Sequence, residues 1–410
     1  MTTGVDPTFD FVDPDLLQRE LPLTQLAYLR QVAPVWWSEQ VGGSQFGDDG
    51  YWVISRHADV ATIFPNSAQW SSQRTGAIIR LPAVVGPEQR GLLNSLIVNL
   101  DPPDHTRLRK LVSRAFTPRA VTTLEERLAA TAQRIVAEAV AGGGGDFVAD
   151  VAAVLPAMAI ADLIGVPEED RDTVSGWINA FSNADDPQVT DGGDVLEVQA
   201  QFAGYAFAMA EQRRERPQDD IVTRLVQPDS DGDVLDDTEF TMFLILLAVA
   251  GSETSRNAIT NGMNAFLEFP DQWELFKKER PAITVEEILR WSTPVHCIQR
   301  TATADIPLHD VTIHEGDRVG LFLSSANYDE TVFDDPFRFD IRRNPNPHLT
   351  FGGHGIHYCL GANLARLEIR LMFDEIARQA PRIRKVAEPQ RVRSGWINGV
   401  NTFEVDYGTR

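Results

Sequence analysis

Helical periodicity dominates the first 290 residues of the chain. Apolar residues recur near i, i+3, i+4 and i+7 over residues 117–140 and 195–216, and a shorter amphipathic pattern covers about residues 23–32. Two strand-like stretches, VWWSE and GYWVISR, lie within residues 34–56 and are separated by a polar, glycine-rich turn. This arrangement predicts a β-hairpin near the N-terminus, among helices.

The pattern changes late in the chain. Over residues 295–323, short β-branched stretches broken by a proline and a glycine predict strands or hairpins, and a helical pattern returns after Cys359. The glycines at 142–145 and the PDSDGD stretch at 228–233 fit surface turns as well as linkers. We therefore expect a mainly α protein with small β-sheets that forms one domain over residues 1–410.

The stretch at about residues 237–268 is apolar on every side through its middle, as expected of a helix buried in a large core. Gly251, Glu253 and Thr254 interrupt this middle. A buried acid without a partner is costly as a charge, and a threonine can bond a helix carbonyl and bend the helix. The interruption is either an ordinary kink with its glutamate in water or a functional feature.

Composition and charge exclude some classes of function. The chain has 410 residues, 43% of them hydrophobic, so it can bury an extensive core. Its net charge of −22 argues against binding to nucleic acid or to anionic membranes. The acidic, proline-broken N-terminus is unlike a signal peptide, and the longest apolar run, residues 240–251, is too short to span a bilayer. Since two cysteines cannot form a disulfide framework here, we expect a soluble cytoplasmic protein.

The stretch FGGHGIHYCLG, residues 351–361, holds Cys359 on a glycine-rich turn. Leucines follow the cysteine at helical spacing, so a helix is predicted to begin there. They are Leu360, Leu364, Leu367 and Leu371. The partial positive charge of a helix N-terminus favours the thiolate, which is the form that ligates metal or attacks carbon.

The glycines of this loop, Gly353, Gly355 and Gly361, permit conformations closed to other residues and let a flat ligand approach the backbone. The alternative is an ordinary turn with a buried structural cysteine. A zinc site is disfavoured because two histidines and the cysteine crowd one short loop without a second ligand pair. The other cysteine, Cys297, lies in a strand-like region and is interpreted as a small buried hydrophobe.

With GIHYCLG and the preceding Phe351, the chain resembles the cytochrome P450 superfamily of haem-thiolate monooxygenases. Three more segments resemble that family in order and spacing, namely DHTRLRK at 104–110, AGSETS at 250–255 and EILR at 287–290. The resemblance implies the P450 fold, a haem b cofactor, and Cys359 as the axial thiolate that binds the iron, with Phe351, Gly353 and Gly361 shaping the haem-binding loop. The loop departs from the family pattern in one respect, because Phe351 lies eight residues before the cysteine instead of seven.

In this family an acid and an alcohol on the distal helix relay protons to the oxygen bound at the haem. The resemblance implies that Thr254 steadies the bound oxygen and that Glu253 brings protons from solvent. The motif begins at Ala250, and Gly251 would leave room for oxygen. The acid and alcohol together separate a monooxygenase from a non-catalytic haem sensor or an electron carrier, either of which could use a cysteine ligand.

Glu287 and Arg290 lie one helical turn apart and can share a face. Thr284 and Glu287 also fit a capping box, in which a threonine caps the helix and a glutamate follows three residues later. The resemblance implies instead that the Glu287–Arg290 pair locks with an arginine of DDPFRFDIRRNPNPH and braces the cysteine loop. Arg338 and Arg343 are both candidates, and the sequence does not choose between them.

Haem propionates need cations at the macrocycle edge, and arginine suits carboxylates through its two-pronged geometry. The resemblance assigns this role to His105, Arg109, Arg300 and His357, while a solvated basic face is the alternative for the first two. Further cations cluster around them, and we expect these to face an acidic ferredoxin, itself served by a ferredoxin reductase. They are Arg107, Lys110, Arg114 and Arg119.

Several stretches narrow the resemblance to the actinobacterial steroid 26(27)-monooxygenases, which oxidise the side-chain end of cholesterol and cholest-4-en-3-one. They include APVWW, DDIVT, ILRWSTPV, RNPNPH and RSGWINGVNTFEVDYG. A sterol tail needs a hydrophobic pocket. Candidate lining residues, each of which would also suit the core, are Ile97, Val98, Val249, Val295, Ile298, Trp396 and Ile397. Fatty acids, terpenes and polyketides stay open as substrates, since pocket segments vary within one fold.

Overall fold

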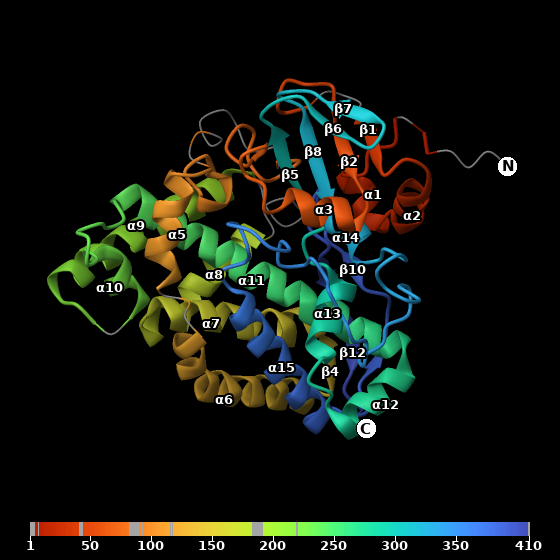
Figure 1. The fold of residues 1–410 in the computed structure, drawn as a ribbon. Helices are drawn as coiled ribbons and strands as arrows, with labels where there is room; N and C mark the ends of the chain where they lie inside the picture. Colours follow the sequence, from red (N-terminus) through yellow and green to blue (C-terminus); the bar gives the residue numbers. More distant parts are fainter. Residues whose placement is uncertain are drawn as a thin grey trace.

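The structure is a computed structural model that describes residues 5–408 except 7, 41–43, 82–90, 92, 115, 117, 183–191 and 219. A smaller β-rich part lies beside a larger helical part, and α11 (Asp237–Glu268) runs through the middle of the helices (Figure 1). The predicted class, mainly α with small sheets, is confirmed.

Helices form most of the regular structure. Before α11 they are α1 (Pro14–Arg19), α2 (Leu23–Val32), α3 (His57–Ile63), α5 (Asp104–Ser113), α6 (Pro118–Gly142), α7 (Val154–Ile164), α8 (Arg171–Ser182), α9 (Gly192–Glu215) and α10 (Ile221–Val226). After it come α12 (Pro270–Glu279), α13 (Thr284–Ser292), α14 (Leu323–Ala326) and α15 (Ala362–Gln379). Short helical turns are η1 (Ile97–Asn99), η2 (Val148–Ala152) and η3 (Glu168–Asp170). The helical patterns read from the sequence correspond to α2, α6 and α9.

The largest sheet has five strands in the order β1-β2-β8-β5-β3. The N-terminal hairpin pairs β1 (Val35–Glu39) with β2 (Gly50–Ile54), and β2 runs parallel to β8 (Arg318–Phe322). On its other side β8 pairs with β5 (Cys297–Ala302), which β3 (Trp70–Ser71) follows at the edge. The sheet therefore joins the N-terminal hairpin to the late strand region.

Smaller sheets hold the remaining strands. β6 (Ile306–Leu308) pairs with β7 (Val311–Ile313), β10 (Gln390–Arg391) with β11 (Val400–Thr402), and β12 (Glu404–Asp406) lies between β4 (Gly144–Asp146) and β9 (Arg384–Lys385). The glycine stretch at 142–145 thus enters a strand, whereas the stretch at 228–233 forms a turn in which Asp229 N–H donates to the carbonyl of Asp233.

α11 begins with a capping box, in which Asp236 accepts a hydrogen bond from the Glu239 N–H and Glu239 accepts one from the Asp236 N–H. Most of its side chains are buried, and it packs on α7, α9, α13 and α15. At Gly262 a Cβ atom would lie 2.8 Å from Ile288 of α13 and 3.0 Å from Phe373 of α15. Glycine is therefore what allows these three helices to approach closely.

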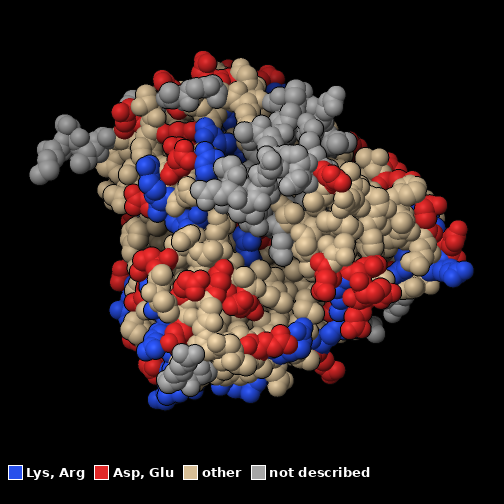
Figure 2. Space-filling model, turned by 180° about the vertical axis from the view of Figure 1, so that it is seen from behind, with Lys and Arg blue, Asp and Glu red and all other residues tan. Residues whose placement is uncertain are grey.

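Three hydrophobic clusters form the core: one among the helices, one under the large sheet, and one between the N-terminal segment and that sheet. Within the described part of the chain, no helix is long and apolar enough to cross a membrane. Acidic and basic side chains lie beside one another on the face shown in Figure 2.

Candidate functional site

The cysteine loop turns back on itself before α15. The Cys359 N–H donates to the Phe351 carbonyl at 3.0 Å, and the Tyr358 N–H donates to the Gly355 carbonyl at 3.2 Å. Gly353 has φ +60° and Gly355 has φ +137°, both in the region that favours glycine. A Cβ atom at Gly355 would lie 2.9 Å from the Phe64 carbonyl oxygen, so α3 also approaches the loop closely.

Two details of the loop differ from the sequence prediction. α15 begins at Ala362, so Cys359 lies three residues before the helix and not at its first position. Gly361 is the N-cap with φ −84°, a conformation open to any residue. Its backbone N–H nevertheless bonds to the Cys359 thiol and, with the guanidinium groups of Arg109 and Arg366, lowers the pKa of that thiol. A backbone N–H at the N-cap of α15 thus favours the Cys359 thiolate, although the cysteine itself lies before the helix.

The Cys359 side chain is accessible although protein surrounds it densely. Burial raises the pKa of its thiol more than the Gly361 N–H and the two arginines lower it. The thiol alone is thus not a ready nucleophile, while a bound metal cation would deprotonate it outright. Cys297, by contrast, is fully buried at the start of β5, and burial raises the pKa of its thiol well above the ordinary range.

Four basic side chains gather beside the loop. The rings of His105 and His357 lie 4.2 Å apart, Arg109 donates to the Tyr358 carbonyl at 2.7 Å, and Arg300 donates to the Gln299 carbonyl at 2.8 Å. Burial lowers the pKa of His105 to about 4, of His357 to about 2 and of Arg300 to about 10. The neighbouring cations add to this effect at both histidines, so the cluster repels further positive charge.

This cluster fits a ligand that carries carboxylates. Among the described residues no carboxylate forms an ion pair with Arg109 or Arg300, and His105 Nδ1 is buried without a hydrogen-bond partner. His357 is engaged by the Ser72 hydroxyl at 3.2 Å and by the Leu100 backbone. Haem propionates would compensate the buried positive charge, and the accessible Cys359 sulfur would supply an iron ligand. The residues present therefore fit haem.

The acid and the alcohol of α11 differ in their surroundings. Thr254 is partly accessible and donates to the Ala250 carbonyl at 2.8 Å, as expected of a threonine that bends a helix. Glu253 is 5% exposed and accepts hydrogen bonds from Arg256 at 2.5 Å and Asn257 at 2.7 Å. The alternative of a glutamate pointing to water is therefore wrong. Ala250 is exposed, one turn before Thr254 on the same face.

Gly251 faces a different neighbour from the one its family role implies. A Cβ atom at this position would lie 2.4 Å from Cδ1 of Ile160 in α7. The missing side chain thus lets α7 pack closely on α11. Room for a small ligand would have to come from the neighbouring Ala250 and Thr254 face.

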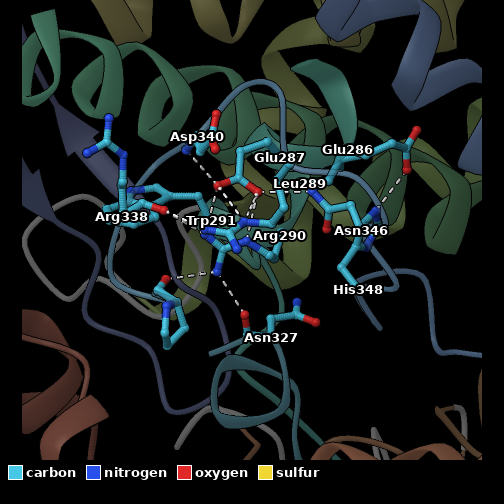
Figure 3. Close-up of polar contacts among 12 residues, drawn as sticks. Glu286, Glu287, Leu289, Arg290, Trp291, Asn327, Arg338, Asp340, Asn346 and His348 are labelled. Carbon is cyan, nitrogen blue, oxygen red and sulfur yellow. Dashed lines mark hydrogen bonds and ion pairs between the residues drawn. The ribbon is translucent and has the colours of Figure 1, made fainter. Parts of the chain in front are cut away.

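Glu287 is the centre of a buried ionic network (Figure 3). Arg290 donates to both of its oxygens at 2.8 Å, and neither side chain is exposed. The Asp340 N–H and the Asn346 amide each donate to it at 2.9 Å. The capping-box alternative is wrong, since Thr284 is the first residue of α13 and forms no side-chain cap.

The geometry distinguishes the two candidate arginines. Arg343 Nε donates to Glu287 Oε2 at 3.2 Å, and its side chain is nearly buried. Arg338 contributes only its carbonyl, which accepts from Arg290 and Arg343. Its own side chain points to Asp271 at the surface. Arg343 is therefore the third member of the network.

A second network, on the adjacent residue Glu286, has no signal in the sequence. Arg366 of α15 donates to it at 2.7 and 3.0 Å, and His348 lies at 2.9 Å. Although burial alone would raise it, these two partners lower the pKa of Glu286 to about 2. The Arg366 guanidinium also lies 4.5 Å from the ring centre of Phe351, so this network ties α13 and α15 to the cysteine loop.

The expected basic docking face on α5 is already neutralised. Arg107 pairs with Asp233 at 2.9 Å and with Glu239 at 2.6 Å. Lys110 and Arg114 pair with acidic residues of the 229–231 turn. The side chain of Arg119 lies outside the described residues. Because the turn supplies one carboxylate for each cation described, the charge argument for a ferredoxin site here fails.

The candidate pocket residues divide among the three clusters. Ile97 and Val249 pack against the helical core, Val295 and Ile298 against the sheet core, and Trp396 against the N-terminal cluster. Val98 is half-buried next to Ile97. The residues brought side by side are Val295 and Ile397, which form an isolated β-bridge. The structure therefore joins two late-chain members of this set directly.

Glu368 of α15 was missed by the sequence analysis. Its side chain is 1% exposed, and among the described residues neither carboxylate oxygen has a hydrogen-bond partner. The Ser255 hydroxyl lies nearby. Burial raises the pKa of Glu368 to about 8, against which Ser255 acts only weakly. One glutamate in a helical pattern carries no signal that its side chain faces inward.

Comparisons with known proteins agree with this geometry. A family model described as "Cytochrome P450" matches residues 282–379. The chain is 50% identical over 98% of its length to a steroid C26-monooxygenase of Rhodococcus jostii, covering 85% of that protein. It is 48% identical over 99% of its length to a steroid C26-monooxygenase of Mycobacterium tuberculosis, covering 94% of it. A methyl-branched lipid omega-hydroxylase of M. tuberculosis is 40% identical over 93% of this chain and 90% of its own.

Solved structures are similar along nearly the whole chain. A Mycobacterium marinum cytochrome P450, CYP268A2, solved in complex with pseudoionone, aligns with a TM-score of 0.88 at 36% identity and covers 95% of this chain and 96% of its own. Bacillus megaterium CYP109E1 in complex with testosterone aligns with a TM-score of 0.81 at 29% identity, covering 95% and 99%.

We predict that Arg343→Ala lowers the free energy of unfolding by about 2–4 kcal/mol, because it removes one donor to the buried Glu287 carboxylate and the guanidinium that donates to the Asp334, Asp335 and Arg338 carbonyls. Arg338→Ala is the matched control and should change it by less than about 0.5 kcal/mol, since its side-chain ion pair is exposed. Denaturant unfolding and haem content after purification measure both effects. Equal losses in the two variants would contradict the assignment of Arg343.

We predict that Glu368→Gln changes how stability depends on pH. The folded-state pKa of Glu368, about 8, is above its ordinary value of 4.5, so the folded protein holds a proton that the unfolded chain has lost between these values. Wild-type stability should therefore fall relative to Glu368→Gln by about 1.4 kcal/mol per pH unit at most as pH rises from about 5 to about 8. Parallel curves of apparent Tm against pH would contradict the buried, protonated Glu368.

Proposed function

The chain belongs to the cytochrome P450 family, and we propose that it hydroxylates the terminal side-chain carbon of a sterol such as cholesterol or cholest-4-en-3-one. The observation that carries this proposal is the 50% identity, over 98% of the chain, to a steroid C26-monooxygenase. Because the match covers 98% of this chain and 85% of that protein, the similarity does not come from a shared fragment. The accessible face of α11 and the basic cluster at the cysteine loop are consistent with the same chemistry.

Haem is the cofactor of this family, and it supplies oxygen activation at an iron with a thiolate ligand. We propose Cys359 as that ligand, with Phe351, Gly353 and Gly361 shaping its loop. His105, Arg109, Arg300 and His357 would face the propionates. This is supported by the guanidinium groups of Arg109 and Arg300, which form no ion pair among the described residues, and by the buried His105 Nδ1, which has no hydrogen-bond partner there. Glu287, Arg290 and Arg343 would hold the loop in place from behind.

The proton route uses side chains of α11. We propose that Thr254 orients the oxygen end of the reacting group by its hydroxyl and that Glu253 supplies the proton, with the Ala250 and Gly251 segment as the wall of the site. The reaction consumes dioxygen, two electrons and two protons for each alcohol and water formed. When proton delivery fails, the same two electrons and two protons yield hydrogen peroxide, so peroxide reports on this route.

Electrons come from a redox partner, as the family requires, and we propose a ferredoxin with its reductase. The paired cations of α5 do not favour that helix as the docking site. Both cysteines are free, which is consistent with work in the reducing cytoplasm. A haem sensor is disfavoured because Thr254 and buried Glu253 would have no task in it.

Substrate contacts are proposed from the late-chain segments and α11. Val295, Ile298, Trp396 and Ile397 would meet the sterol, joined by Ile97, Val98 and Val249. A second candidate is omega-hydroxylation of a methyl-branched lipid, which the 40% identity to such an enzyme favours. The two substrates share a branched alkyl end, so one pocket could present either to the haem.

Titration with cholest-4-en-3-one tests the substrate. Binding should displace water from the iron and convert the haem from low to high spin, and the absorbance change should saturate at micromolar sterol. A methyl-branched fatty acid is titrated in parallel. A full spin shift with the branched lipid and none with the sterol would replace the sterol assignment by the second candidate.

Thr254→Ala tests the proton route. The variant should consume NADH with a ferredoxin system while yielding mostly peroxide, because the hydroxyl that orients the reacting oxygen is gone. Thr260→Ala is the matched control, since it also removes a hydroxyl of α11 that donates to the carbonyl one turn before it, here that of Arg256, at a buried position. Product yield per NADH equal to wild type in Thr254→Ala would contradict the route.

A further inference from the structure

The two side chains of the proposed relay bond in opposite directions along α11. Thr254 donates back to the Ala250 carbonyl, whereas Glu253 is held one turn forward by Arg256 and Asn257. Both of these donors reach the same oxygen, Oε1. Oε2 is buried and has no hydrogen-bond partner among the described residues. Glu253 is therefore held through Oε1, while Oε2 remains available to bind a proton.

Asn257 makes a second contact with the other end of its amide. The Val400 N–H donates to its Oδ1 at 3.2 Å, and the residue is fully buried. Gly399 lies so close that a Cβ atom there would be 3.0 Å from Asn257 Nδ2. One side-chain amide thus connects Glu253 to the start of β11, and its orientation is fixed from both sides.

Residues 394–400, here called the C-terminal turn, are in turn attached to the segment before β5. The Asn398 N–H donates to the Pro294 carbonyl at 2.8 Å, and the His296 N–H donates to the Trp396 carbonyl at 2.7 Å. Val295 and Ile397 are bridged between these segments. The turn therefore carries the residues proposed to contact the sterol and, at its far end, the residue that orients Asn257.

We propose that Asn257 is a positioning residue that links the substrate-contacting turn to proton delivery. It holds Glu253 by Oε1 so that Oε2 stays in place to carry the proton, and Val400 sets the orientation of the amide that does so. A sterol seated against Trp396 and Ile397 is thereby connected to Glu253 through the C-terminal turn. This inference rests on the proposed role of Glu253.

The chain offers a matched control one helical turn away. Asn261 also donates to the C-terminal turn, through Nδ2 to the Asn398 carbonyl at 3.1 Å, but among the described residues it forms no hydrogen bond with Glu253. Asn261→Ala therefore weakens the same attachment and spares the relay. Gly399→Ala is a second probe, because it presses on the Asn257 amide from the turn and leaves α11 unchanged.

The experiment measures the ratio of peroxide to hydroxylated sterol per NADH in the holoenzyme, with the carbon monoxide spectrum as a check of the haem thiolate. Asn257→Ala should raise this ratio about three- to tenfold, the scale of losing one ordinary hydrogen bond, because Arg256 still holds Glu253. Gly399→Ala should raise it less. Asn261→Ala should stay within about twofold of wild type. Hydrogen exchange of residues 396–402 should increase in both asparagine variants, which shows that the turn is loosened in each.

A double variant separates the two levels of the proposal. Asn257→Ala added to Glu253→Gln should not raise the ratio further, because both changes act on one route. If Glu253→Gln raises the ratio, two outcomes overturn this inference but leave the relay in place. One is a ratio in Asn257→Ala no higher than in Asn261→Ala. The other is that Asn257→Ala raises the ratio equally in the wild-type and the Glu253→Gln backgrounds. Wild-type coupling in Glu253→Gln overturns the proposed relay and this role of Asn257 with it.

Discussion

The buried carboxylate of Glu287 is the constraint on which the cysteine loop depends. A charge removed from water is tolerated only when its lone pairs are satisfied, and here Arg290, Arg343, Asn346 and the Asp340 N–H all contribute. Three of these donors come from the segment 340–346 that leads into the loop. Satisfying one carboxylate therefore fixes the path of the chain toward Cys359.

A second charge on the neighbouring residue completes this arrangement. Glu286 binds Arg366 of α15 and His348, so successive positions of α13 hold the two flanks of the loop. In the same region Arg109 and Arg300 of the basic cluster form no ion pair among the described residues. The charges of Glu286 and Glu287, which support the loop, are thus paired within the protein, whereas Arg109 and Arg300 beside the cysteine form no ion pair among the described residues. This is the pattern expected where a cofactor carries anionic groups.

On α11, too, polar side chains are held by specific hydrogen bonds. Thr254 donates to the backbone of its own helix, whereas Glu253 accepts from Arg256 and Asn257, and Asn257 also accepts from the C-terminal turn. Because interior polar groups act at low dielectric, small shifts of the turn have large effects on the groups they meet. Under the proposed roles, substrate position and proton supply are parts of one connected network.

The sequence by itself determined the class of the fold and the residues with chemistry, since helical periodicity and the glycine-cysteine motif are local patterns. It could not place α15 three residues after Cys359, because the start of a helix depends on capping contacts. Nor could it choose Arg343 over Arg338, pair the cations of α5 with the 229–239 segment, find the partners of Glu286, or find Glu368 buried. These features join residues tens of positions apart, and only the packing of the whole chain decides which charges are removed from water and which partners they meet.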